Sequence, residues 1–78
     1  MSLVSLSSLQ PGAVCRLQTM ELYGGLRRRL RDLGFLPGSK IACVLKSPSG
    51  SPVAYAVKGA VLALRVEECR KIFVSTDV

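Results

Sequence analysis

The densest charge in the sequence is a run of arginines: Arg27, Arg28, Arg29 and Arg31 fall within five positions. Guanidinium groups pair with carboxylates and phosphates, so such a run suits docking of an acidic protein, a phosphate or a nucleic acid. On a helix, which turns by about 100° per residue, Arg27, Arg28 and Arg31 gather on one side, and Arg29 lies nearer the leucine edge. The solvated side of an amphipathic helix has the same composition, so both interpretations stay open. The three gathered arginines are the candidate partner-binding residues.

A basic chain also raises the question of nucleic acid. Proteins that bind single strands combine positive charge with aromatic side chains on which the bases stack. The chain has two tyrosines, two phenylalanines and no tryptophan, and Tyr55 and Phe73 lie in strand patterns where core packing is expected. The sequence therefore ranks a nucleic-acid-binding barrel below a protein-binding one, and we expect no nucleic acid partner.

Candidate metal ligands are few. The chain has no histidine, and its three cysteines, Cys15, Cys43 and Cys69, are far apart with no CxxC pair. A structural zinc site needs four Cys or His ligands at close paired spacing, so no metal ligand is assigned from the residues. Cys43 falls on the apolar face of a predicted strand and is expected in the core. Cys15 and Cys69 are left as candidate exposed thiols, which could share a transition metal between two copies.

Catalytic groups are scarcer still. Without histidine, neither a Ser-His-Asp nor a Cys-His arrangement can be built. Glu67 and Glu68 are adjacent, so on a helix their carboxylates point apart rather than converge as an acid and a base. The glycines fall at turn and cap positions without the spacing of a phosphate-binding loop. We expect no catalytic residue, no required cofactor and no enzymatic activity.

Length and composition set the frame for these residues. The 78 residues are 49% hydrophobic with a net charge of +6, which fits a single domain over residues 1–78. A domain of this size buries only about 60% of its surface, so its core is thin. No apolar run approaches the ~20 residues of a membrane span, and the first residues lack the basic and apolar regions of a secretory signal. Three sparse cysteines favour a reducing compartment. We therefore expect a cytoplasmic domain with no direct membrane insertion.

A short helix must carry the arginines. Leu26, Leu30 and Leu33 are spaced as i, i+4 and i+7, which places them on one helical stripe. Gly34 follows the last leucine as the expected C-terminal cap, and Pro37 with Gly38 marks the stop. A helix this short is unstable alone, so it is expected to dock on a sheet through its leucines.

The rest of the chain alternates with period two, as half-buried strands do. We expect Ile41, Cys43 and Leu45 to share one face of their strand, and Val53, Tyr55 and Val57 to share one face of the next. The Ser-rich first residues are expected to be a short lead-in, and residues 67–69 a single helical turn. The pattern predicts a mainly β protein, a small β-barrel of about five strands with one short helix after the first strand. The expected strands are residues 13–20, 40–46, 53–58, 61–66 and 72–74.

Three segments together resemble the FeoA (ferrous iron transport protein A) family. They are Leu9-Gln10-Pro11-Gly12, the stretch from Leu26 to Gly38 (LRRRLRDLGFLPG), and the stretch from Val57 to Arg65 (VKGAVLALR). The resemblance runs from about Leu6 to Val74, and the order of the three segments is more specific than any one of them. The resemblance implies an SH3-like barrel with a helix inserted after the first strand, which agrees with the predicted elements.

The family resemblance also implies a context. FeoA proteins are small cytosolic components of bacterial ferrous iron uptake that act on the FeoB membrane permease, which carries a cytosolic GTP-binding domain. A related domain lies at the C-terminus of iron-dependent repressors, and the wider family is associated with transition metals. The resemblance brings no ligand set that can be placed on this chain.

The leading hypothesis is an accessory protein that binds and modulates the FeoB-type permease from the cytoplasmic side. Its expected contacts are Arg27, Arg28 and Arg31, with part of the loop over residues 47–52. The alternative is a transition-metal-binding or metal-sensing domain for Fe²⁺ or Zn²⁺. A homodimer is compatible with Tyr23, Phe35 and Leu36, which are expected to be exposed near the helix.

Overall fold

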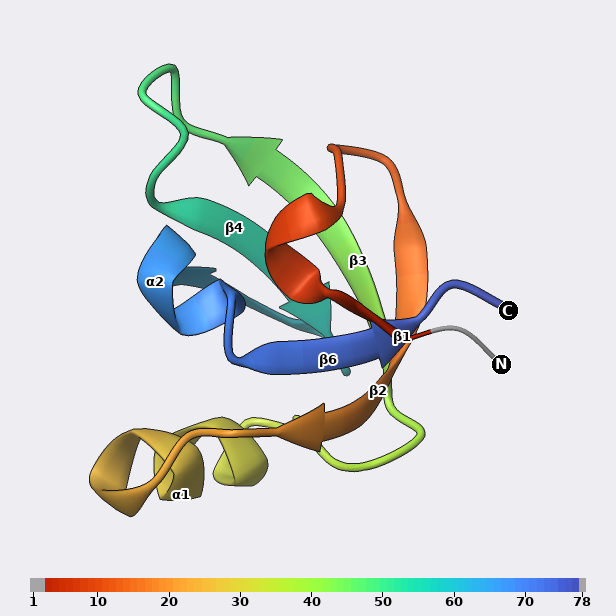
Figure 1. Ribbon diagram of the computed structural model, residues 1–78, viewed down its shortest axis with the longest axis vertical. Coiled ribbons are helices and arrows are strands. Elements are labelled where there is room, and N and C mark those ends of the chain that lie inside the picture. The colour runs from red at the N-terminus through yellow and green to blue at the C-terminus, as the bar shows by residue number, and fades with distance from the viewer. Residues whose placement is uncertain (1–2, 78) are drawn as a thin grey trace.

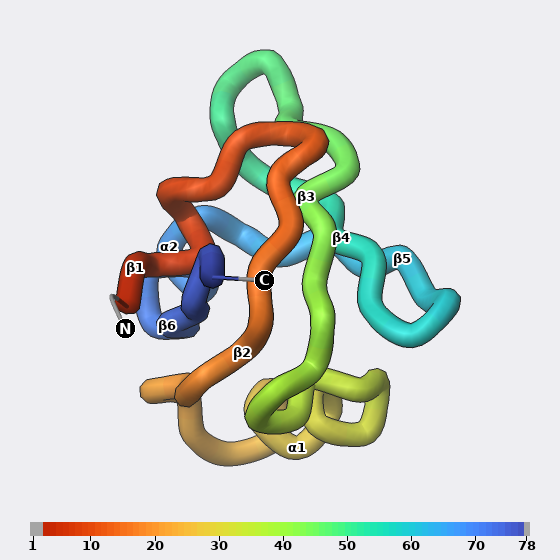
Figure 2. Tube along the Cα trace, turned by 90° about the vertical axis from the view of Figure 1, so that its right-hand side faces the viewer, coloured from red at the N-terminus to blue at the C-terminus, as the bar shows by residue number. Residues whose placement is uncertain are grey.

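The computed structural model describes residues 3–77, in which six antiparallel strands form one strongly curved sheet (Figure 1). The strand order is β1-β6-β2-β3-β4-β5, so β6, the last strand in sequence, lies between β1 and β2 (Figure 2). No helix in residues 3–77 is long and apolar enough to cross a bilayer. The elements in chain order are β1 (Leu3–Ser5), η1 (Leu6–Ser8), β2 (Val14–Met20), α1 (Gly24–Asp32), β3 (Lys40–Lys46), β4 (Val53–Val57), β5 (Ala60–Leu64), α2 (Val66–Cys69) and β6 (Ile72–Ser75).

The mainly β class and the five expected strands are confirmed, with β3 matching its expected range in full and the helix following β2, the first of the expected strands. The strand expected over residues 61–66 is shorter than predicted, because β5 ends at Leu64 and Val66 begins α2. The sixth strand was missed because β1 is only three residues long, too short to show a periodic pattern. The lead-in is held in place by Leu6 and Leu9, which are buried, and by Ser5, whose hydroxyl donates to the carbonyl of Cys69 at 3.1 Å. The N-terminal segment is therefore part of the fold.

The core consists of side chains from the concave face of the sheet together with η1, α1 and α2. Val53, Tyr55 and Val57 all point inward, as the alternation predicts. The expectation for β3 is wrong at one position: Leu45 is 64% exposed. The cause is a register shift between Cys43 and Leu45 opposite β4, which ends the alternation there. The fully or nearly fully buried apolar residues are Leu6, Leu9, Cys15, Leu17, Leu22, Leu30, Phe35, Ile41, Cys43, Val53, Tyr55, Val57, Leu64, Cys69, Ile72 and Val74.

Helix α1 begins two residues earlier than expected, so both glycines of the Gly24-Gly25 pair belong to its first turn. Its end is a Schellman motif: the N–H of Phe35 donates to the carbonyl of Leu30 at 2.9 Å, and the N–H of Gly34 to that of Arg31 at 3.0 Å. Gly34 has a φ of +110°, which confirms the expected cap. Phe35, by contrast, was expected to be exposed and is completely buried, because this motif turns the chain back and places Phe35 in the core cluster that also contains Leu30.

Candidate partner-binding surface

The four arginines of α1 are all exposed, because the helix buries its opposite side. Leu30 is fully buried and Leu26 packs against the core, which fixes the helix against the sheet. Arg29 and Arg31 lie in the last turn, where positive charge is favoured by the helix dipole. The helix is therefore docked through its leucines and presents a set of long cationic side chains to solvent.

Arg27, Arg28 and Arg31 line one hollow of about 410 Å³, together with Tyr23, Gly24 and Asp32. We call this the arginine surface. Tyr23 is 84% exposed and stands just before the first turn of the helix. The structure thus places in one hollow the three arginines that the helical spacing predicts to lie together. Arg29 lines a separate hollow with Leu26 and residues of β5 and α2, as its place at the leucine edge predicts.

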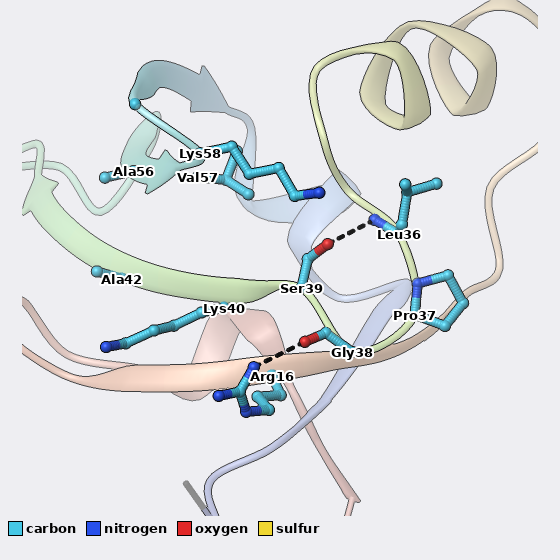
Figure 3. A pocket seen from close by; sticks show the side chains of 11 residues that line it. Arg16, Leu36, Pro37, Gly38, Ser39, Lys40, Ala42, Ala56, Val57 and Lys58 are labelled. Atoms are coloured by element: carbon cyan, nitrogen blue, oxygen red, sulfur yellow. Dashed lines mark hydrogen bonds between the residues drawn. The ribbon is translucent and has the colours of Figure 1, made fainter.

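A second basic hollow was not anticipated from the sequence. Arg16, Lys40 and Lys58 line a cleft of about 650 Å³ on the outer face of β2, β3 and β4 (Figure 3). Its wall is formed by Leu36–Ser39 and its floor by Ala42 and Ala56. We call it the cationic cleft. Alternation predicts the outer face for each of these cations, but it does not show that all three line one cleft.

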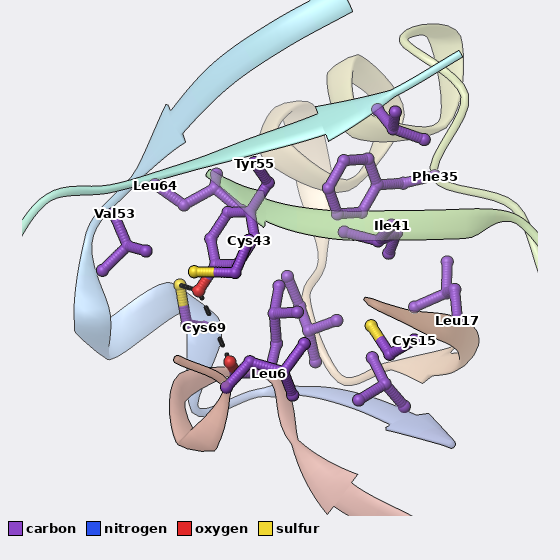
Figure 4. Close-up of a cluster of buried hydrophobic side chains, with 14 of the residues drawn as sticks. Leu6, Cys15, Leu17, Phe35, Ile41, Cys43, Val53, Tyr55, Leu64 and Cys69 are labelled. Carbon is purple, nitrogen blue, oxygen red and sulfur yellow. Dashed lines mark hydrogen bonds between the residues drawn. The ribbon is translucent and has the colours of Figure 1, made fainter. Parts of the chain in front are cut away.

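The three cysteines are all in the core with free thiols (Figure 4). The expectation for Cys43 is confirmed. The expectation that Cys15 and Cys69 are exposed is wrong, since both have no exposed surface. Cys15 lies on the inner face of β2, and Cys69 ends α2 against the interior. Burial raises the pKa of all three thiols, that of Cys15 to about 11, so they stay protonated at neutral pH.

Tyr55 lies among these thiols at the centre of the core. Its hydroxyl donates toward the sulfur of Cys69 at 3.3 Å and toward the carbonyl of Leu6 at 3.4 Å. Burial, followed by its bond with Cys69, raises the pKa of Tyr55 far above its usual value. The residues are therefore arranged as a neutral, packed core. Within residues 3–77, no three His, Cys, Asp or Glu side chains gather closely enough to hold a metal ion.

Comparison with known proteins identifies the family. Residues 4–76 match the FeoA domain. No curated protein matches the chain. Among solved structures, the chain is similar to the FeoA protein of Chlorobium tepidum, with 29% sequence identity and a TM-score of 0.90, over 96% of this chain and 71% of that one. It is also similar to iron(II) transport protein A of Clostridium thermocellum, with 33% identity and a TM-score of 0.85, over 92% of this chain and 44% of that one.

A third similar structure is FeoA of Stenotrophomonas maltophilia complexed with zinc. It has 30% identity and a TM-score of 0.80, over 92% of this chain and 89% of that one. That protein is described as a procaryotic SH3 domain protein and a candidate ferrous iron transport activating factor. The resemblance seen in the sequence is thereby confirmed. The chain belongs to the FeoA family, which is linked to ferrous iron transport, and it has the SH3-like fold.

Proposed function

We propose that the chain is a non-enzymatic, cytoplasmic accessory protein of ferrous iron uptake that binds and modulates a FeoB-type membrane permease. The arginine surface is the proposed contact. The observation that carries the proposal is the gathering of Arg27, Arg28 and Arg31 with the exposed Tyr23 in one hollow. Arginine and tyrosine are the residue types enriched at the energetic centres of protein interfaces.

Charge supports an acidic partner at this hollow. The three guanidinium groups share it with a single carboxylate, Asp32. A partner that places carboxylates here would gain charge-assisted hydrogen bonds and would relieve the repulsion among the arginines. Because α1 is anchored by Leu30 and by its Schellman cap, the side chains start from a fixed backbone, so less conformational freedom is lost on binding.

The experiment compares two variants of equal net charge. Arg27→Glu with Arg31→Glu reverses two charges of the arginine surface. Arg70→Glu with Lys71→Glu reverses two exposed charges outside it. Binding to the cytosolic GTP-binding part of the permease is measured by calorimetry at low and physiological ionic strength. We expect the first variant to bind about 10- to 100-fold more weakly, the loss of about 1–2 charge-assisted contacts, and the second to bind as the unmodified chain does.

The comparison separates a specific surface from bulk charge. If both variants lose affinity equally, net charge alone drives the association and the assignment of the arginine surface fails. If neither loses affinity at low ionic strength, this surface takes no part in binding. Thermal unfolding of each variant shows whether the fold is intact, and we expect little change because all four side chains are exposed.

A second candidate function, binding of a transition metal, is favoured by the zinc complex of the Stenotrophomonas maltophilia protein. The cysteines of this chain are poorly placed for it, since their thiols are buried and protonated. Binding of Fe²⁺ or Zn²⁺ by the folded chain would raise its melting temperature in proportion to RT ln(1 + [L]/Kd). A rise in the unmodified chain that disappears in a triple Cys→Ser variant would support a thiolate site. An unchanged melting temperature at saturating metal would reject this function.

A further inference from the structure

The cationic cleft is built from residues that oppose one another across the sheet. Arg16 of β2 is paired with Lys40 of β3, and Ala42 of β3 with Ala56 of β4. Lys58 follows the last residue of β4, in the turn to β5, where its φ is +49°, and its side chain lines the same cleft. Directly opposite residues in a sheet share one face, and like charges in such positions repel. Arg16 and Lys40 are therefore neighbours on the outer face of two adjacent strands, and Lys58 adds a third cation to the cleft from the turn after β4.

Beside these cations runs a row of apolar residues. Val14 is paired with Ala42, Ala42 with Ala56, and Ala56 with Val61. The alanines lie in the middle of the row, and their methyl groups are too small to fill the outer face, so a cleft of about 650 Å³ is left above them. Val61 at the end of the row is 67% exposed. A cationic edge and a concave apolar floor thus lie side by side.

Two of the three cations, Arg16 and Lys58, are held in place. The Nη1 of Arg16 donates to the carbonyl of Gly38 at 2.9 Å, which fixes the guanidinium at the cleft wall (Figure 3). The stem of Lys58 passes over Gly34 so closely that a Cβ there would lie 3.0 Å from the Lys58 Cδ. No Asp or Glu of residues 3–77 lines the cleft. The structure therefore positions positive charge without a countercharge of its own.

We propose that the cationic cleft is a second docking site, which takes an acidic, amphipathic segment of a partner protein. Carboxylates of the segment would pair with Arg16, Lys40 and Lys58, and its small or medium apolar side chains would fill the space above Ala42 and Ala56. This inference is independent of the arginine surface and of the function proposed for it. A protein segment fits better than a bilayer, because the apolar floor is concave and offers no side chain to insert. It fits better than a single-stranded nucleic acid, because no aromatic residue among those described lines the cleft.

The test is a ¹⁵N NMR titration with a capped hexapeptide of alternating glutamate and leucine. We expect shift changes at Ala42, Ala56 and Gly59, and binding that weakens from low to physiological ionic strength. A hexapeptide of alternating lysine and leucine should leave these signals in place. If the lysine peptide binds equally well, or if the glutamate peptide shifts signals elsewhere, the proposal is wrong.

Variants locate the site. Lys58→Gln should weaken binding of the glutamate peptide about threefold, and adding Arg16→Gln should bring the loss to about tenfold. Lys46→Gln with Arg70→Gln removes two charges outside the cleft and should have little effect. Ala56→Leu fills the floor of the cleft while keeping every charge, and we expect it to abolish binding of the glutamate peptide. Arg16 donates a hydrogen bond to the carbonyl of Gly38, so the double variant that includes Arg16→Gln could unfold. In that case the single variants Lys58→Gln and Ala56→Leu still test the site.

Anionic vesicles test the alternative that the cleft binds a lipid surface. Vesicles rich in phosphatidylglycerol are titrated against the same signals. If they shift Ala42, Ala56 and Gly59 and displace the peptide, the cleft binds a lipid surface and the proposal of a protein segment is overturned. If they leave these signals unchanged, the acidic segment is supported.

Discussion

Replacing Gly34 with alanine tests how the helix end and the cationic cleft are joined. The backbone there has a φ of +110°, which costs a residue with a Cβ about 1–2 kcal/mol. The new Cβ would lie 3.0 Å from the Lys58 Cδ and 3.3 Å from its Cγ, so that stem must leave its position. Moving a flexible side chain off its preferred rotamer costs about 0.5–1.5 kcal/mol. We expect the free energy of unfolding to fall by about 2–3 kcal/mol, which lowers the melting temperature by roughly 10–20 °C.

Two further variants separate these contributions. Gly50 has a φ of +90° and nothing within 4 Å of a built Cβ, so Gly50→Ala carries the backbone cost alone. Gly34→Ala in a Lys58→Ala background removes the stem that the Cβ would meet. We expect Gly50→Ala to cost about 1–2 kcal/mol, and the double variant to lose less stability than the two single changes added together.

The assay is denaturant unfolding followed by circular dichroism, with thermal unfolding as a second measurement. Equal losses for Gly34→Ala in the presence and absence of the Lys58 side chain would show that the stem does not lie over Gly34. A loss below about 0.5 kcal/mol for Gly34→Ala would refute the positive-φ argument as well. Either result would remove the reason for treating Lys58 as a positioned cation.

Three further predictions concern the core and the cationic cleft. Tyr55→Phe should lower the free energy of unfolding by about 1–2 kcal/mol, because the carbonyl of Leu6 and the sulfur of Cys69 lose their donor; urea unfolding measures it. Burial raises the thiol pKa of Cys15 from 9.0 to about 11, so the stability that this thiol contributes should be complete at neutral pH and should be lost between pH 9 and 11, where the unfolded thiol ionises first. The fall in stability over this range should be shallower in Cys15→Ala. Lys40→Gln should raise stability by a few tenths of a kcal/mol at low ionic strength, because it removes the charge directly opposite Arg16, and the gain should vanish in high salt.

The elements of the fold were predictable because most of them carry a local pattern. Period-two alternation placed Tyr55 inside and Lys40 outside, and the leucine spacing placed the helix. What failed lacks a local signal: β1 is too short for a pattern, the register shift near Leu45 depends on the pairing with β4, and the burial of Phe35 depends on how the helix cap turns the chain.

The arginine surface and the cationic cleft also differ in how far the sequence predicts them. Arg27, Arg28 and Arg31 belong to one helix, so their grouping follows from their spacing in the sequence. Arg16 and Lys58 are 42 residues apart, one in β2 and the other in the turn after β4, and only the folded sheet brings them to one cleft. Alternation predicts which face of the sheet a residue lies on, but not which residues of other strands or turns lie beside it. A cleft built from several segments can therefore be identified only in the structure.

The position of β6 has a consequence for how the chain is made. Because Ile72–Ser75 pair with β1 on one side and β2 on the other, residues 3–5 have their strand partner about seventy positions away. Sheets with such distant pairings form slowly, since closing a long loop costs conformational entropy before the strand contacts that offset this cost can form. While the chain is still on the ribosome and β6 has not emerged, β1 and one edge of β2 are without a partner. The sheet is thus completed only after translation has passed Ser75, and until then the two edges of β1 and β2 that pair with β6 stay open in the nascent protein.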